Sequence, residues 1–289
     1  MKRLLWLGYA VGLFLVYATV VPRLEQVIPE GLLTIFQSHR VIGEDFLLRK
    51  DRPAAVLVGT SLSSLLPRIA LAPVYNLAMS GGSSLAGMRL LMATEPAPRV
   101  LFIEANLFIR PADEDLLAEL LNPVALRIKS ICDACLARNQ PVTLALSIVS
   151  NLRLRPLSES EQDRLNVTVA ANPEVQRRGL TMHLKGSDSP VSPDKMRTVL
   201  DALSLQIREL EQKGTRVIFV EMPMHPDLIG AAYYQSGLAA AKAKFSPLLH
   251  QWISFTGRNF ETSDGAHLIY RDAREVAAEL SSIANSALR

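Results

Sequence analysis

The chain has 289 residues, of which 49% are hydrophobic and 20% charged, and its formal net charge is +3. This composition excludes a disordered chain, and the length allows one large domain with a substantial core. The basic residues are scattered along the sequence, so we expect no nucleic-acid partner.

The amino terminus has the pattern of a membrane anchor. Lys2 and Arg3 precede an uncharged run, Leu4 to Val21. We predict a transmembrane signal anchor over residues 1–21, in the inner (cytoplasmic) membrane, with the rest of the chain on the periplasmic side. A cleaved signal peptide is the alternative, because Val16-Tyr17-Ala18 resembles a cleavage site. A buried core helix is a further alternative.

After a juxtamembrane tether over 22–53, the sequence alternates between strands and helices. Dense apolar runs at 54–58, 74–78 and 99–104 predict three strands, and helical segments follow the first two and, after a loop, the third. This alternation is typical of a parallel sheet with helical crossovers. We therefore predict an α/β domain over 54–289.

The regular pattern stops within the predicted domain. We interpret residues 110–193 as a mainly helical or irregular insertion, in which 142–149 fits either a helix or a strand. Four arginines of this insertion either contact an anionic polymer or form a solvated face. These are Arg153, Arg155, Arg177 and Arg178.

Regular structure returns near the carboxyl end of the insertion. We predict helices over 194–213 and 231–251, a strand over 216–221, a short strand within 252–263, and a terminal helix over 270–287. Together the segments predict a three-layer sandwich with a central, mostly parallel sheet.

Ser61 is the candidate nucleophile of this fold. The first predicted strand runs directly into Gly59-Thr60-Ser61, so Ser61 stands at the carboxyl edge of the sheet, where open α/β folds bind their ligands. The alternative is that Ser61 caps the following helix.

A serine needs a base to remove its proton, and the base is usually a histidine oriented by a carboxylate. Of five histidines, His267 follows Asp264 by three residues, at the entry to the terminal helix. We predict His267 as the base and Asp264 as its partner. A capping aspartate and a surface histidine are the alternative, and His225 is a minor rival base or a substrate contact.

Acyl transfer also needs donors that face the developing oxyanion. Gly81 follows the second predicted strand, and Asn106 follows the third. Both positions fit an oxyanion hole. An ordinary turn at Gly81 and a loop-bonding side chain at Asn106 are the alternatives.

The order of these segments resembles the SGNH (GDSL-like) hydrolase superfamily, which has a flavodoxin-like α/β fold. The resemblance rests on four short blocks: 59–62, 76–81, 104–106 and 264–268. It implies a triad and an oxyanion hole. In the triad Ser61 is the nucleophile, His267 the base and Asp264 the orienting carboxylate; Ser61, Gly81 and Asn106 line the oxyanion hole.

Three residues depart from the usual motifs of that superfamily: Thr60, Glu104 and Leu107. With the amino-terminal anchor, the pattern is most similar to the membrane-tethered branch that accompanies O-acyl transfer to bacterial envelope polysaccharides. The resemblance implies a serine-dependent O-acyl transferase or esterase, most simply for acetyl groups. It also implies a polysaccharide or acyl-ester substrate, a membrane-bound O-acyltransferase as a partner, and neither a cofactor nor a metal.

Two other functions fit the sequence. One is a non-catalytic accessory protein of SGNH fold within a polysaccharide-modification assembly, which the three departures favour. The other is an unrelated Rossmann-like binding module.

Cys132 and Cys135 lie in a segment predicted to be helical. They lack the further ligands of a zinc site, and we expect a pair of core thiols, reduced or bonded to each other.

Overall fold

The computed structural model describes residues 2–25, 33–153 and 171–289. Its contacts divide the chain into two compact units. One unit consists of Met1–Leu48 and Ala118–Ser158, and the other of Arg49–Leu117 and Glu159–Arg289. The second unit contains every residue predicted for the active site.

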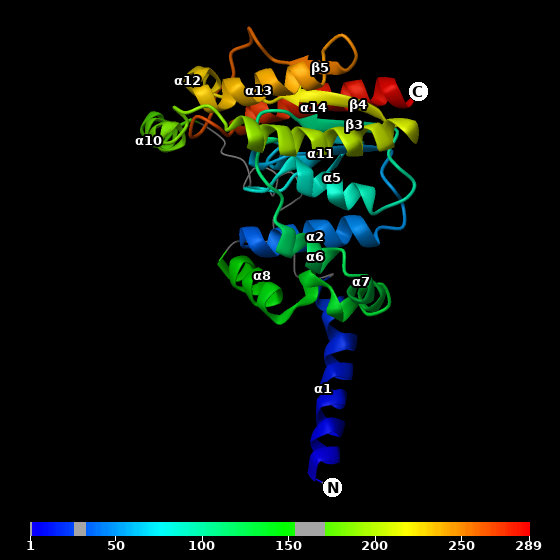
Figure 1. The fold of residues 1–289 in the computed structure, drawn as a ribbon. Coiled ribbons are helices and arrows are strands. Elements are labelled where there is room, and N and C mark those ends of the chain that lie inside the picture. The colour runs from blue at the N-terminus through cyan, green and yellow to red at the C-terminus, as the bar shows by residue number, and fades with distance from the viewer. Residues whose placement is uncertain (1, 26–32, 154–170) are drawn as a thin grey trace. The chain divides into compact units, whose positions relative to one another are not determined.

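The second unit is an α/β domain around a parallel sheet (Figure 1). The sheet has five strands in the order β2-β1-β3-β4-β5, and each neighbouring pair is parallel. The strands are β1 (Ala55–Val58), β2 (Tyr75–Asn76), β3 (Val100–Glu104), β4 (Arg216–Glu221) and β5 (Gln251–Ser254). The predicted α/β class and parallel sheet are thereby confirmed.

The apolar runs explain which strands are central. All residues of β1 and β3 are buried, and the two strands pair in register from Ala55 opposite Val100 to Val58 opposite Ile103. Strands covered on both faces need apolar side chains throughout, because neither face meets water. The strand order reverses between β1 and β3, and this reversal is where open α/β sheets form a ligand crevice beyond the strands' carboxyl ends.

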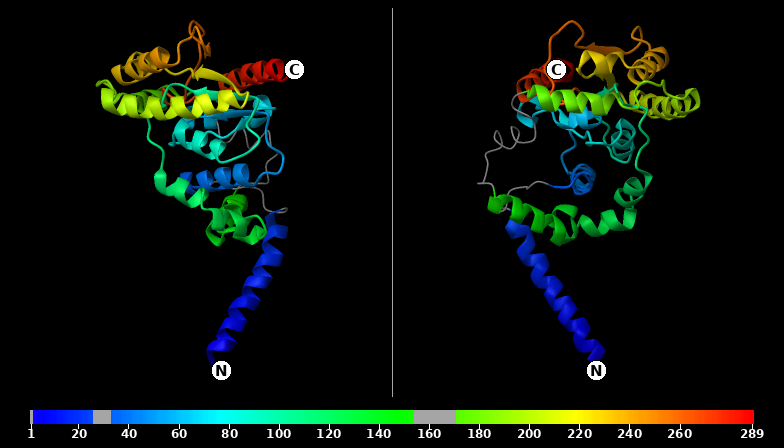
Figure 2. Two further views of the ribbon diagram at one scale, coloured as in Figure 1. Left: turned by 45° about the vertical axis from the view of Figure 1, so that its right-hand side comes forward. Right: turned by 90° about the vertical axis from the view of Figure 1, so that its left-hand side faces the viewer.

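Helices cover both faces of the sheet (Figures 1 and 2). The helices of this unit are α3 (Ser61–Ser64), α4 (Arg68–Leu71), α5 (Ser84–Met92), α10 (Pro173–Leu184), α11 (Pro193–Gln212), α12 (Pro226–Gly230), α13 (Ala232–Lys244) and α14 (Tyr270–Leu288). On one face, α4 and α14 pack together and α14 contributes to the core with side chains of β1, β3 and β4. On the other face, α5 contacts β1, and α11 contacts α5, α13 and β4. The layers agree with a three-layer sandwich.

One helix is shorter than predicted because of a proline. The helix expected over 231–251 ends as α13 at Lys244, and Gln251 already begins β5. Pro247 lies in the intervening turn, where its ring and missing N–H do not allow the helix to continue. The segment 142–149 is helical.

The first unit is helical. It contains α1 (Lys2–Glu25), α2 (Ile35–Leu48), α7 (Pro123–Lys129), α8 (Pro141–Arg153) and two short 3-10 turns, whereas α6 (Glu114–Leu120) crosses from the second unit into the first. Buried Glu44 accepts hydrogen bonds from the Lys129 ammonium and from the Ala137 N–H at 2.6 Å. None of the helices formed by described residues is long and apolar enough to cross a membrane.

The cysteines lie in the first unit, Cys132 before and Cys135 at the end of a 3-10 turn, Asp133–Cys135, rather than in the predicted helix. Their free thiols lie 2.7 Å apart, so they form a pair as expected, but they are half-buried and not in the core. Burial, followed by the hydrogen bond with Cys132, raises the pKa of the Cys135 thiol to about 11.

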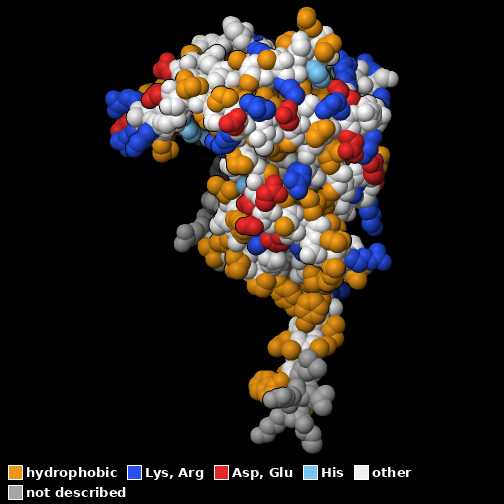
Figure 3. All heavy atoms as spheres, viewed as in Figure 1, with side chains coloured by type: hydrophobic (Ala, Val, Ile, Leu, Met, Phe, Trp, Pro, Cys, Tyr) orange, Lys and Arg blue, Asp and Glu red, His pale blue; other side chains and the backbone are white. Residues whose placement is uncertain are grey.

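The described surface mixes charges of both signs. On the face seen in Figure 3, Lys and Arg side chains alternate with Asp and Glu over the sheet unit. Of the four arginines singled out in the sequence, Arg178 is exposed and pairs with Glu174 one turn earlier on α10. Arg155 and the side chain of Arg153 lie outside the described residues.

Candidate active site

Ser61 is the first residue of the short helix α3, directly after the turn that ends β1. Thr60, rather than Ser61, is the N-cap residue: its side chain accepts a long hydrogen bond of 3.4 Å from the Leu62 N–H. The interpretation of Ser61 as the helix cap is therefore wrong. The Ser61 side chain is half-buried, and among the described residues its hydroxyl forms no hydrogen bond.

A buried carboxylate holds this turn. Glu104, at the end of β3, is fully buried, and its oxygens accept hydrogen bonds from both the N–H and the hydroxyl of Thr60, at 2.8 and 2.5 Å. The N–H and hydroxyl of Ser63 donate to the same carboxylate at 3.2 and 2.6 Å. Gly59 allows this approach, because a Cβ there would lie 2.6 Å from a Glu104 oxygen.

Burial has the largest effect on the pKa of Glu104. Desolvation raises the pKa of its carboxyl, and the four hydrogen bonds from Ser63 and Thr60 lower it by less. The Glu104 carboxyl group thus connects Thr60 and Ser63, which flank Ser61 and Leu62, to the neighbouring strand β3. This arrangement fixes the backbone of the turn that presents Ser61.

The second sequence block is tied to the same turn. The Asn76 amide donates to the Ser63 carbonyl at 2.8 Å, and the hydroxyls of Ser64 and Ser80 lie 2.6 Å apart, within hydrogen-bonding distance. Gly81 follows Ser80, is exposed and has a φ of +71°, in the left-handed region that favours glycine. The loop predicted to supply an oxyanion donor therefore lies beside α3.

Asn106 connects the ends of β3 and β4. Its side-chain amide donates to the Met222 carbonyl at 2.9 Å, and its side-chain oxygen accepts from the Met222 N–H at 2.6 Å. This role is structural, but it is not the expected alternative of a bond within Asn106's own loop, because Met222 follows a different strand. An amide nitrogen carries two hydrogens, however, so one donor is left after the bond to Met222.

Asp264 and His267 lie in one loop that folds back on itself. Thr262 and Leu268 form an antiparallel bridge, and the Ser263 N–H donates to the His267 carbonyl at 2.7 Å. One oxygen of Asp264 accepts the N–H groups of Ala266 and His267, at 3.0 and 2.8 Å. The local spacing thus gives Oδ1 of the carboxylate two backbone donors.

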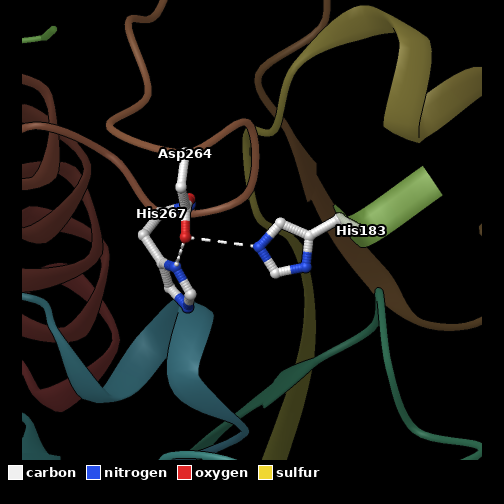
Figure 4. A group of neighbouring side chains, drawn as sticks. All are labelled: His183, Asp264 and His267. Carbon is white, nitrogen blue, oxygen red and sulfur yellow. Dashed lines mark hydrogen bonds and ion pairs between the residues drawn. The ribbon is translucent and has the colours of Figure 1, made fainter. Parts of the chain in front are cut away.

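The side chains of this pair have the geometry of an oriented base (Figure 4). The other oxygen of Asp264, Oδ2, lies 2.7 Å from His267 Nδ1. Burial raises the pKa of Asp264, but the hydrogen bonds and the charge interaction with His267 outweigh it, so the net pKa is lowered. An ionised carboxylate only accepts, so Nδ1 carries the proton and Nε2 presents a lone pair.

His267 Nε2 is buried and has no hydrogen-bond partner among the described residues. No hydrogen bond therefore joins it to Ser61. Ser61 and His267 nevertheless belong to the same edge of the sheet. The His225 N–H, just beyond the carboxyl end of β4, donates to the Gly265 carbonyl at 2.8 Å and so connects the His267 loop to that edge. Catalytic hydrogen bonds are often long without substrate and shorten in the complex.

His225, the rival base, has a structural role. It is the N-cap residue of α12, and its Nδ1 accepts from the Asp227 N–H at 3.3 Å. A ring nitrogen used as a cap acceptor is not available as a general base. Of the two histidines proposed from the sequence, His267 has the free basic nitrogen.

Sequence reasoning missed two side chains of this site. Glu104 had a signal, since it is a charged residue at the end of a buried apolar run and also departs from the usual motif. His183 had none: it lies in α10, within the polar insertion, and its Nε2 reaches Asp264 Oδ2 at 3.2 Å. Figure 4 shows Asp264 Oδ2 facing both imidazole rings.

The same three side chains could hold a metal ion. Single ligand atoms of His183, Asp264 and His267 all lie within 4.8 Å of one another. Two imidazoles and a carboxylate are a common ligand set for zinc. Asp264 Oδ2, which lies between the two imidazole rings, already accepts hydrogen bonds from both of them. This arrangement suits a histidine base that is oriented by a carboxylate.

A cavity of about 370 Å³ adjoins Asn106 at the carboxyl ends of β4 and β5. Its wall is largely apolar and includes Met222, Ile229, Tyr234, Leu238 and Phe260. The charged side chains of its lining are paired, Glu221 with Lys242 at 2.7 Å and Arg258 with Glu279 at 2.5 Å. The cavity therefore suits an uncharged ligand.

Comparison with protein-family models, with curated proteins and with solved structures finds no match to this chain. The function must therefore be argued from the residues and their geometry.

Proposed function

We propose that the protein is a serine-dependent O-acyl transferase or esterase of SGNH type, with Ser61 as the nucleophile. The observation that carries this proposal is the Asp264–His267 pair, whose buried Nε2 has no partner among the described residues and belongs to the same sheet edge as Ser61. The strand order, with its reversal between β1 and β3, is the flavodoxin-like order and supports the same reading.

The reaction proceeds in two halves. Ser61 Oγ attacks the ester carbonyl carbon while His267 Nε2 takes its proton, and the tetrahedral intermediate then expels the alcohol, which receives that proton. The acyl group remains as an ester on Ser61. Water or a sugar hydroxyl, deprotonated by His267, attacks this ester, and the serine regains its proton.

The negative oxygen of each intermediate needs hydrogen-bond donors. We assign them to the N–H groups of Ser61 and Gly81 and to the remaining amide hydrogen of Asn106. Each such donor contributes about 2.7–4 kcal/mol to the stability of the transition state. Gly81 lies in the loop joined to α3 through Ser64 and Ser80, and this position supports the assignment.

A covalent serine probe tests the proposal. A fluorophosphonate should label the wild-type chain once, at Ser61; Ser61→Ala should abolish labelling, and His267→Ala should slow it by at least about 100-fold. Ser282→Ala, at an exposed position on α14, is the matched control. Unlabelled wild-type protein with an intact fold, and without ester hydrolysis, would contradict a catalytic role.

That contradictory outcome would favour the accessory function. The missing hydrogen bond between Ser61 and His267 is the specific observation for it. A non-catalytic protein would keep the fold and the loop geometry while binding a polysaccharide. Binding of acylated and deacylated polysaccharide, measured by calorimetry with the Ser61→Ala variant, distinguishes a scaffold from an enzyme that releases its product.

The substrate and the location follow from the sequence resemblance. We propose an envelope or exported polysaccharide, or an acyl ester derived from it, as the substrate, with a membrane-bound O-acyltransferase as a partner. The proposed inner-membrane anchor, with the domain on the periplasmic side, rests on the sequence alone, on the Leu4–Val21 run behind Lys2 and Arg3, since none of the described helices is long and apolar enough to cross a membrane. Protease protection in spheroplasts and carbonate extraction of the full chain test this topology.

A further inference from the structure

We infer that His183 is a positioning residue for the Asp264–His267 pair, supplied by helix α10 from within the predicted insertion. The inference rests on the proposed function and deepens it, because it gives the triad a second histidine. It also gives a role to a segment that none of the four sequence blocks covers.

One face of α10 contacts the loop that carries the pair. Gln176 Nε2 donates to the backbone carbonyl and to the hydroxyl of Thr262, at 3.0 and 3.2 Å. Gly179, Leu180 and His183 follow at helical spacing from Gln176, so the four residues share one face. Contacts at both ends and in the middle of this face fix the helix against the loop.

The centre of the contact is close-packed. A Cβ on Gly179 would lie 2.5 Å from the Asp264 Cβ and 2.7 Å from its carbonyl oxygen, so only glycine allows the helix to approach. Leu180 packs against Gly265, the residue that follows Asp264. Such close packing between a helix backbone and a loop leaves Asp264 little freedom to move.

His183 completes the set of hydrogen bonds to Asp264. Its Nε2 lies 3.2 Å from Oδ2, the same oxygen that meets His267 Nδ1. The rings of the two histidines lie 6.0 Å apart at an angle of 67°. Oδ1 meanwhile accepts two backbone N–H groups, so Asp264 accepts four hydrogen bonds, and only one orientation of the carboxylate satisfies all of them.

This arrangement decides which nitrogen of His267 is basic. With Oδ2 held in place by His183, the Nδ1 proton of His267 stays on the carboxylate side and the lone pair stays on Nε2. His183 does not touch the reacting atoms in this scheme. It acts through Asp264, and small misplacements of a catalytic group reduce the rate steeply, by about 100-fold for a shift near 1 Å.

The test compares two replacements of His183. His183→Gln keeps a side-chain N–H for Asp264, whereas His183→Leu fills similar space without a donor. For hydrolysis of a soluble nitrophenyl ester we expect His183→Leu to lower kcat by about 10–100-fold with KM within about twofold, and His183→Gln to keep kcat within about threefold. Arg178→Leu, on an exposed part of the same helix, is the matched control.

A second readout does not need turnover. Long-range ¹H–¹⁵N spectra of the imidazoles report which nitrogen of His267 is protonated; we expect the Nδ1–H form in wild type and in His183→Gln, and a mixture of tautomers in His183→Leu. Gly179→Ala, which pushes the loop away, should give the same mixture. An unchanged tautomer and an unchanged kcat in His183→Leu would overturn the positioning role.

The outcomes separate this inference from the proposed function. If wild-type protein neither reacts with the serine probe nor hydrolyses esters, the catalytic proposal fails while the tautomer shift still decides the role of His183. If wild type is active and His183→Leu keeps its rate and its tautomer, the triad stands and the inference about His183 is wrong.

Discussion

The carboxylate of Glu104 accepts both the backbone N–H and the hydroxyl of Thr60, which lies 44 residues earlier in the chain, in the turn after β1. The two residues are also two of the three departures from the usual SGNH motifs. In the fold they are partners: a carboxylate at the end of β3 holds the turn at the end of β1. The departures therefore form a coupled pair that orders the turn before Ser61.

The first prediction concerns this pair. Glu104→Ala leaves the N–H groups of Thr60 and Ser63 buried without an acceptor, so we expect it to destabilise the fold by about 1–3 kcal/mol or more and to slow labelling of Ser61. Glu104→Gln can accept the same N–H groups and donate to the Thr60 hydroxyl. Because burial already disfavours the charged carboxyl, we expect Gln to lie within about 1 kcal/mol of wild type.

Urea unfolding and probe-labelling rates measure both effects. Glu95→Ala, which removes an exposed carboxylate paired with Lys213, is a control for the loss of a surface charge. Equal stability and equal labelling in Glu104→Ala and wild type would show that the turn does not depend on Glu104.

The three central strands were predictable because each is a local apolar run, whereas β2 is limited to Tyr75–Asn76 of the predicted 74–78. Residues 216–221 form β4 as expected, and β1 and β3 differ from their predicted ranges by one residue at the start. The order of the strands also placed Ser61, Asn106 and the His267 loop at one edge. These features depend on periodicity and on the parallel topology, both of which the sequence expresses locally.

The contacts that complete the site were not predictable in the same way. His183 reaches Asp264 across about eighty residues of chain, and no local pattern marks a histidine in a polar helix as its partner. Similarly, the association of Ala118–Ser158 with the amino-terminal helices, rather than with the sheet, depends on tertiary contacts such as those of buried Glu44. One sequence without its relatives does not reveal such pairs.

A second prediction follows from the lowered pKa of Asp264. A carboxyl whose pKa is lower in the folded than in the unfolded chain stabilises the fold above its unfolded pKa of about 3.9, and this contribution is lost as the pH falls below that value. The stability advantage of wild type over Asp264→Asn should therefore be constant from about pH 7 to about pH 5 and shrink as the pH falls from about 5 to about 2. Chemical unfolding at each pH measures it, with exposed Asp188→Asn as the charge-matched control. A constant difference would argue against the ionised pair.

Asn106 gives a third prediction, since it has both a structural and a proposed catalytic role. Asn106→Asp keeps an acceptor for the Met222 N–H but loses both amide hydrogens, so we expect kcat to fall by about 100–1000-fold. Asn106→Ala should lose the same rate and also stability, because the Met222 backbone is left unpaired. If both variants kept the wild-type kcat, Asn106 would be only the connection between β3 and β4.

The cavity beside Asn106 gives the last prediction. Its uncharged, largely apolar wall suits the acyl part of the ester, and each methylene buried there should add about 0.8 kcal/mol, or roughly fourfold in kcat/KM. Leu238→Trp fills the cavity, so we expect it to lower kcat/KM for a nitrophenyl hexanoate by about tenfold or more while changing that for the acetate by less than about twofold. Leu205→Trp, at an exposed position of α11, is the matched control. Two results together would place the acyl group elsewhere and leave the cavity to the acceptor sugar. The kcat/KM of the wild-type enzyme would not rise with the chain length of the ester, and the Leu238→Trp variant would hydrolyse both esters as wild type does.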